Sequence, residues 1–363
     1  MNVSFGALVR RWGGRAVALA ITGVGIYIVA PSLLTLFGAW PRLRDVQPWW
    51  FVVLVALETC SMASLWWLTR LALAHDDRAD GGTPVAQVGW GAVASAQLAG
   101  NAASKVIPGG PAPGGVVQAR LLIRAGQPPA AVASALTAVG LLTYGVLLLL
   151  PVLALPALFI GPPPAKQLQL GLLVSLLLAV LIVGLGVTAL TWRGVLERVG
   201  RAVGYVIHVA RRAVTPQSVA TSLVAQRDRV ATAFEGHWWR AVFASAANRM
   251  FDYAALVAAL VAFGAHARPS EVLLAYVVAQ ALTLIPLTPG GLGFVESGLT
   301  TFLVLIGISA DTALIATLLY RLVSFWLPIP VGAFAYAGWH IHRNTRVEPM
   351  KSAGAGADGE ALP

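Results

Sequence analysis

Charged residues are scarce in this chain of 363 residues. Only 11% are Asp, Glu, Lys or Arg, whereas 58% are hydrophobic. Soluble globular domains carry about 25% charged residues, so the chain has too few charged residues to cover a water-facing surface. This composition excludes an ordinary soluble fold and predicts an all-α polytopic membrane protein.

Cysteine is nearly absent, since Cys60 is the only one. A single cysteine excludes an intrachain disulfide and a cysteine metal cluster. The six histidines lie in loops or at the ends of hydrophobic runs, so we expect no metal site and no cofactor. The sequence contains no Walker loop, nucleotide fingerprint or nucleophile and base set. We therefore expect a protein that is not an enzyme.

Long hydrophobic runs are what the chain has instead. Six of them approach or exceed the roughly 20 residues that a helix needs to cross a bilayer, and each is predicted to be a transmembrane helix. They are residues 16–38, 49–74, 130–158, 168–191, 239–264 and 312–339. The first run is longer than the apolar part of a signal peptide, so it is expected to be retained.

The placement of Lys and Arg predicts the orientation of these helices, because positively charged loops favour the cytoplasm. Arginines put the N-terminus, residues 193–237 and the C-terminal tail on the cytoplasmic side. The net charge of +10 is therefore interpreted as a topology signal and not as a nucleic-acid patch. We expect the protein in the inner (plasma) membrane, with both termini in the cytoplasm.

Two stretches between these segments must begin and end on the same side of the membrane. Residues 86–117 start and end at the cytoplasm, and residues 271–308 start and end outside. Each contains a Pro-Gly-Gly break, formed by Pro108, Gly109 and Gly110 and by Pro289, Gly290 and Gly291. We predict two broken hairpins, which are either re-entrant or made of two short crossings.

Oppositely oriented hairpins are typical of an inverted repeat. An Ala-Gln pair precedes each break, at residues 96–97 and 279–280. The alternative is a chance recurrence of short strings in a chain with 37 glycines and 22 prolines. The predicted organisation is a first membrane half, a basic amphipathic cytoplasmic connector, a second membrane half and a disordered tail, at residues 1–191, 192–237, 238–342 and 343–363.

Ionisable side chains inside predicted spans are the main functional candidates, because each costs about 2.5 to 3.5 kcal/mol at a helix centre. Glu296 follows the second break, where a restarting helix offers free N–H groups to an anion and Gly293 permits close approach. Arg321 suits pairing with a carboxylate or phosphate. Glu296 and Arg321 either bind or gate a substrate or form a buried pair that fixes helix packing.

Other charged positions leave the same choice open. Arg249 and Asp252 share one helix face and either neutralise each other or contribute to a substrate site. Arg120 and Lys105 either supply positive charge near the first break or anchor the helices at the interface. The candidate substrate-binding or gating residues are Pro108, Gly109, Gly110, Arg120, Pro289, Gly290, Gly291, Gly293, Glu296, Arg321, Arg249 and Asp252.

The second break carries a resemblance to a known family. Residues 285–296 (IPLTPGGLGFVE), followed by Tyr-Arg-Leu at 320–322 and Trp-Leu-Pro at 326–328, resemble the transmembrane region of lysylphosphatidylglycerol synthases and its stand-alone relatives. Residues 101–126 are similar to the first motif of that family, but prolines follow the glycines and no acidic residue lies beside them. The resemblance covers nearly the whole chain.

In the two-part members of this family, the membrane region is the flippase and a separate soluble domain makes the lipid. The resemblance implies a stand-alone translocase that moves a phospholipid or lipid-linked headgroup between leaflets by alternating access at the two hairpins. It implies a membrane phospholipid with an anionic or aminoacylated headgroup as partner, and no nucleic acid. A second copy of the chain or a lipid enzyme is a candidate protein partner.

Two other functions fit the same sequence. One is a secondary transporter of a small anion or amphiphile, which shares the architecture. The other is a non-transporting membrane subunit of a lipid-modifying system.

Overall fold

The computed structural model describes most of the chain. It covers residues 46–79, 88–107, 111–159, 192–210, 215–234, 236–283 and 289–347, with isolated positions between residues 173 and 188. All regular secondary structure in these residues is helical, which confirms the predicted all-α class. Three of the described helical segments are long and apolar enough to cross a bilayer, namely Pro48–Ala74, Pro129–Leu150 and Ala310–Trp339.

Some predicted features lie outside the described residues. These are the predicted span at residues 16–38, the first Pro-Gly-Gly break at residues 108–110 and the tail from residue 348. Of the predicted span at residues 168–191, only isolated helical positions are described.

The first half contains two long helices with a helical hairpin between them. The long helices are α2 (Pro48–Ala79) and α5 (Pro129–Phe159), and the hairpin consists of α3 (Trp90–Val106) and α4 (Pro111–Arg124). The second limb of the hairpin therefore continues past the predicted end at residue 117. α2, α4 and α5 each begin at a proline, whose fixed φ and missing N–H suit the first position of a helix.

The second half repeats this order. α9 (Trp238–Ala262) precedes a hairpin of α10 (Pro269–Leu282) and α11 (Phe294–Leu305), and the short 3-10 turn η1 (Pro289–Gly291) lies at the break between its limbs. Gly290, Gly291 and Gly293 all have positive φ, a conformation that only glycine adopts readily. The break is therefore a true interruption of the helix.

The last predicted span is one helical segment with a change of pitch. α12 (Ala310–Arg321) passes through the π-helical turn η2 (Leu322–Trp326) into α13 (Pro328–Val347). π-turns within helices are rare and often lie at functional sites.

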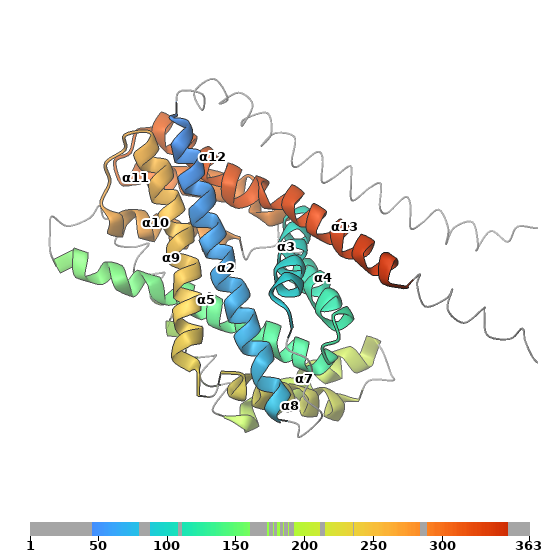
Figure 1. Ribbon diagram of the computed structural model, residues 1–363. Helices are drawn as coiled ribbons and strands as arrows, with labels where there is room; N and C mark the ends of the chain where they lie inside the picture. Colours follow the sequence, from blue (N-terminus) through green and yellow to red (C-terminus); the bar gives the residue numbers. More distant parts are fainter. Residues whose placement is uncertain are drawn as a thin grey trace, which may run out of the picture.

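The helices of the two halves are interleaved in space. α2 packs along α9, and α13 from the end of the chain lies across α3 from the first hairpin (Figure 1). The two halves therefore form one packed body.

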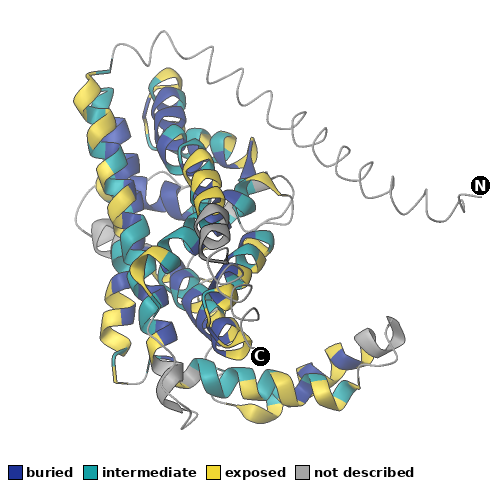
Figure 2. Cartoon of the chain, turned by 45° about the vertical axis from the view of Figure 1, so that its right-hand side comes forward, coloured by how far each residue is buried: buried dark blue, intermediate teal, exposed yellow. Residues whose placement is uncertain are grey.

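The connector, which the sequence predicted to be basic and amphipathic, is a helix pair. α7 (Arg193–Ala210) packs on α8 (Pro216–Thr232), and Figure 2 shows exposed residues along much of both helices. The Asp228 carboxylate accepts hydrogen bonds from Arg227 and from Arg193, which lower the pKa of Asp228. Because the side chains of Arg193 and Asp228 are 63% and 38% exposed, this ion pair contributes little stability.

Two apolar clusters form the core. The first includes Leu54, Leu147, Leu256, Tyr276 and Leu299. The second includes Leu68, Val93, Leu121, Val132 and Ala241. α2, α5 and α9 contribute to both clusters, so each of these helices passes from one cluster to the other. The residues between the clusters on these helices include the polar ones that form the site below.

Small residues bring several helices into close contact. A Cβ atom added to Gly100 of α3 would lie 2.8 Å from the carbonyl oxygen of Gly114 in α4. A Cβ atom added to Gly332 of α13 would meet the Leu98 carbonyl and would lie 2.6 Å from Cβ of Ala102, both in α3. Close backbone approach at small residues is typical of helix packing in membranes.

We expect Gly332→Ala to destabilise the protein by about 1 to 3 kcal/mol, because the added methyl overfills the contact between α13 and α3. This loss should exceed the gain of about 0.5 to 1 kcal/mol that Ala brings to a helix. Gly338→Ala is the matched control, since nothing lies within 4 Å of a Cβ atom added to Gly338 in the same helix. Thermal unfolding in detergent micelles measures both, and equal melting temperatures would contradict the assigned packing.

Candidate functional site

A polar cavity of about 400 Å³ lies between the two apolar clusters. Side chains of both membrane halves line it, from α2, α3, α4 and α5 and from α9, α10, α12 and η2. The charged residues of its lining are Glu58, Lys105, Arg249, Asp252 and Arg321. Charged side chains within apolar helices of a membrane protein are costly, so these residues are functional candidates by default.

The Asp252 carboxylate organises one side of the cavity. One of its oxygens accepts hydrogen bonds from the Tyr276 hydroxyl at 2.8 Å and from Gln280 Nε2 at 2.7 Å, and the other accepts one from the Tyr320 hydroxyl at 2.7 Å. The donors come from α10 and α12, whereas Asp252 is on α9. The carboxylate thus joins three helices of the second half.

Arg249 does not pair with Asp252, although the two residues are three positions apart on α9. The described residues include no ion pair between them, and Nε of Arg249 has no hydrogen-bond partner there. The guanidinium carbon of Arg249 lies 5.6 Å from the ring centroid of Tyr144 in α5. The two side chains thus form no direct ion pair among the described residues, and both line the cavity.

Glu58 of α2 faces the same cavity from the opposite half. Its side chain is buried, and Oε2 has no hydrogen-bond partner among the described residues. One turn further along α2, Ser61 exchanges hydrogen bonds with Asn248 of α9, which holds the two helices together at this level. Glu58 and Arg249 thus both line the cavity. Oε2 of the Glu58 carboxyl group and Nε of the Arg249 guanidinium have no hydrogen-bond partner among the described residues.

Lys105 connects the first hairpin to the last helix. Its Nζ donates a 2.6 Å hydrogen bond to the carbonyl oxygen of Ser324 and lies 5.5 Å from the Phe325 ring centroid. Ser324 belongs to the π-turn η2, where the altered helical pitch changes the usual backbone pairing. A residue that the sequence placed only near a break is therefore a contact between the two halves.

The second break is held by Glu296 and Arg321. Arg321 Nε lies 2.8 Å from Glu296 Oε1, and the two side chains are only 7% and 13% exposed. The other oxygen of Glu296 accepts a 2.7 Å hydrogen bond from the Gly293 N–H at the start of α11. Arg321 also donates to the Gly290 carbonyl at 3.3 Å. Geometrically, Glu296 and Arg321 form the buried pair that was one of the two sequence-based alternatives, while Arg321 also lines the cavity.

The remaining candidates divide between the cavity and the surface. Gly290 lines the cavity, and Pro289, Gly291 and Gly293 shape the break beside it. Arg120 is exposed on α4 and is not part of the cavity lining.

Two cavity residues were not predicted to be part of the site and appeared in the sequence only as markers of a repeat. Gln97 in α3 and Gln280 in α10, the glutamines of the two Ala-Gln pairs, both line the cavity. Gln97 accepts a hydrogen bond from Gln118 Nε2 of α4, and Gln280 donates to Asp252. A polar amide in an otherwise apolar helix was the available signal for both residues.

The sequence profile of the lysylphosphatidylglycerol synthase TM region matches residues 15–332. The chain belongs to this family. A search of curated proteins finds no match. Within the family's matched region lie both hairpins, the Glu296 and Arg321 pair and every charged residue of the cavity. The suspected family is therefore confirmed, and it identifies a membrane protein linked to lipid modification.

A double-mutant cycle on Glu296→Gln and Arg321→Gln should show that the pair in this family member is a strong tertiary contact. We expect a coupling energy of about 1 to 3 kcal/mol, because neither side chain is well solvated. Arg193→Gln and Asp228→Asn form the matched exposed pair, whose coupling should stay below about 1 kcal/mol. Unfolding in mixed micelles measures both cycles. Equal coupling energies in the two cycles would contradict the conclusion that the Glu296 and Arg321 pair stabilises the second break.

Proposed function

We propose that the protein is a lipid translocase, which moves a phospholipid or a lipid-linked headgroup between the two leaflets and is not itself an enzyme. The observation that carries this proposal is the charged cavity between two apolar clusters, lined by both membrane halves. A polar headgroup crossing a bilayer needs such a path, because the hydrocarbon region offers it no hydrogen-bond partners. The family supports a role in lipid chemistry.

The charges in the cavity suit a headgroup that carries a phosphate. Arg249 and Lys105 would pair with the phosphate, since charge-assisted hydrogen bonds to guanidinium and ammonium groups are the strong ones. Glu58 would accept a hydrogen bond from an amine or hydroxyl of the same headgroup. Nε of Arg249 and Oε2 of Glu58 have no partner among the described residues and are available for this binding.

The two hairpins would open the cavity alternately to each leaflet. We propose that they form an inverted repeat among six full transmembrane helices, with both termini in the cytoplasm and the protein in the plasma membrane. The equivalent positions of Gln97 and Gln280 on the first limbs of the hairpins support the repeat. The contact between Lys105 and the Ser324 carbonyl couples the first hairpin to the π-turn, so it is a candidate gate.

The proposal is tested by reconstitution into vesicles that contain headgroup-labelled phospholipids, followed by transbilayer exchange. Wild-type protein should accelerate the exchange over empty vesicles. Glu58→Gln and Arg249→Gln should each slow it about tenfold, the effect of losing roughly 1.4 kcal/mol of charge-assisted hydrogen bonding.

Controls match each change with the same chemistry outside the cavity. Glu271→Gln, in the first turn of α10, and Arg240→Gln, exposed on α9, should leave the exchange unchanged. Exchange no faster than in empty vesicles across several anionic and cationic lipids would refute the translocase.

A secondary transporter of a small anion or amphiphile is the second candidate. It would use Lys105 and Arg249, the two cations of the cavity lining that Glu296 does not pair. Uptake of water-soluble anions without lipid exchange would select it. If instead the protein is a non-transporting subunit, Glu58→Gln and Arg249→Gln should leave function intact in a folded protein.

A further inference from the structure

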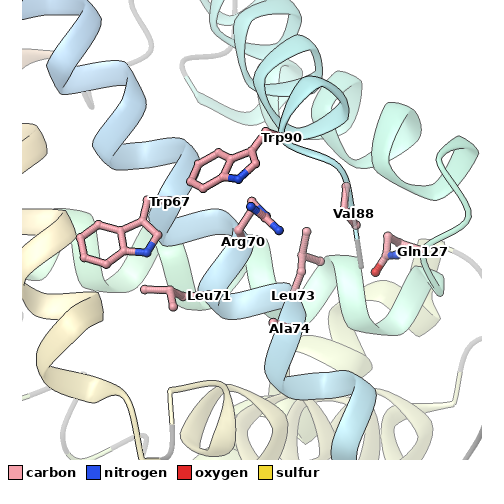
Figure 3. Close-up of a pocket in the computed structure, with 8 residues that line it drawn as sticks. All are labelled: Trp67, Arg70, Leu71, Leu73, Ala74, Val88, Trp90 and Gln127. Carbon is pink, nitrogen blue, oxygen red and sulfur yellow. The ribbon is translucent and has the colours of Figure 1, made fainter. Parts of the chain in front are cut away.

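A second pocket, of about 170 Å³, lies near the end of α2 that faces the connector. Trp67, Arg70 and Ala74 of α2 line it together with Trp90 at the start of α3 and Gln127 from the loop before α5. It shares no lining residue with the central cavity. In Figure 3, Arg70 lies close to the Trp90 ring, with Trp67 on one side and Gln127 on the other.

Arg70 is held in this pocket by an aromatic contact. Its guanidinium carbon lies over the Trp90 ring, 4.3 Å from the ring centroid, which is within the range of a cation–π attraction. None of the ion pairs among the described residues includes Arg70. A guanidinium carries five N–H donors in a planar fork that matches phosphate geometry.

The backbone around Trp90 adds to the positive potential. α3 begins at Trp90 after Gly89, with no side-chain cap and with no acidic residue in its first turn. The positive end of the helix dipole therefore lies beside the ring that stacks on Arg70. The helix start and the guanidinium both favour an anion in the pocket.

The remaining lining indicates which anion binds. Leu71, Leu73, Ala74 and Val88 make the rest of the pocket wall apolar, and Trp90 is 52% exposed. Tryptophans at such a position are typical of the membrane interface, where lipid phosphates lie. A phosphate that brings its own apolar chains fits this lining better than free phosphate.

We propose that the Arg70 and Trp90 pocket binds the phosphate of a phospholipid at the membrane interface, as a site separate from the central cavity. Arg70 donates hydrogen bonds to the phosphate oxygens from its edge, and Trp90 holds the guanidinium in place. The glycerol and the first carbons of the acyl chains contact Leu71 and Val88.

Protection of a thiol placed in the pocket tests this site directly. In a Cys60→Ala background, which removes the only native thiol, Ala74→Cys introduces one at the pocket wall. Short-chain dioctanoyl phosphatidylglycerol should slow the reaction of this thiol with a water-soluble maleimide. Arg70→Ala should raise the lipid concentration needed for half-protection at least about tenfold, the effect of one lost charge-assisted hydrogen bond.

The matched control is Arg240→Ala. The guanidinium carbon of Arg240 lies 5.2 Å from the centroid of the Trp239 ring, so it is also stacked on a tryptophan, but it is exposed and lines neither pocket. This change should leave the protection unaltered. Arg70→Gln serves as the second variant if Arg70→Ala does not fold, with the same expected loss.

Several results would overturn the proposal. Equal protection by dioctanoylglycerol, which lacks a phosphate, would show that only acyl chains fill the pocket. Equal protection by inorganic phosphate would assign the site to a free anion. Protection that survives in Arg70→Ala and Arg70→Gln would remove Arg70 from the site. None of these results bears on the translocase, because the central cavity has a different lining.

Discussion

A carboxylate buried in a membrane protein must find its hydrogen-bond donors within the protein, because lipid supplies none. Asp252 finds three, from Tyr276, Gln280 and Tyr320. Satisfying that single group brings α9, α10 and α12 to one level and faces the carboxylate toward the cavity. The arrangement of the second half around the cavity depends on this requirement.

Other helices also carry polar residues where they pass the cavity. α2 runs from Leu54 in one apolar cluster through Glu58 and Ser61 to Leu68 in the other. α9 likewise has buried polar residues between its apolar contributions to the two clusters. Apolar packing in the two clusters supplies stability through van der Waals contacts between closely packed helices, because lipid chains are as apolar as the side chains and give no hydrophobic driving force between helices. This stability offsets the cost of the charged layer, which can then serve binding.

Single residues show which features of the fold were predictable from the sequence. The Pro-Gly-Gly strings predicted the broken hairpins, because a break in a helix is a local property of proline and glycine. The charge of Arg321 predicted a carboxylate or phosphate partner, and the candidate named beside it, Glu296, lies at 2.8 Å. The spacing of Arg249 and Asp252 placed both on one helix face but did not predict their contacts. Asp252 takes its hydrogen-bond donors from α10 and α12, and the spacing of residues along α9 carries no information about them.

The sequence by itself determined that this is a helical membrane protein with two breaks, because hydropathy, helix-breaking residues and charge placement act locally along the chain. Only the tertiary structure decided which charges share a space. It joined Lys105 to the Ser324 carbonyl, brought Gln97 and Gln280 to one cavity and stacked Arg70 on Trp90. Each of these contacts joins residues that are far apart in sequence, so its geometry follows from helix packing and not from any local pattern.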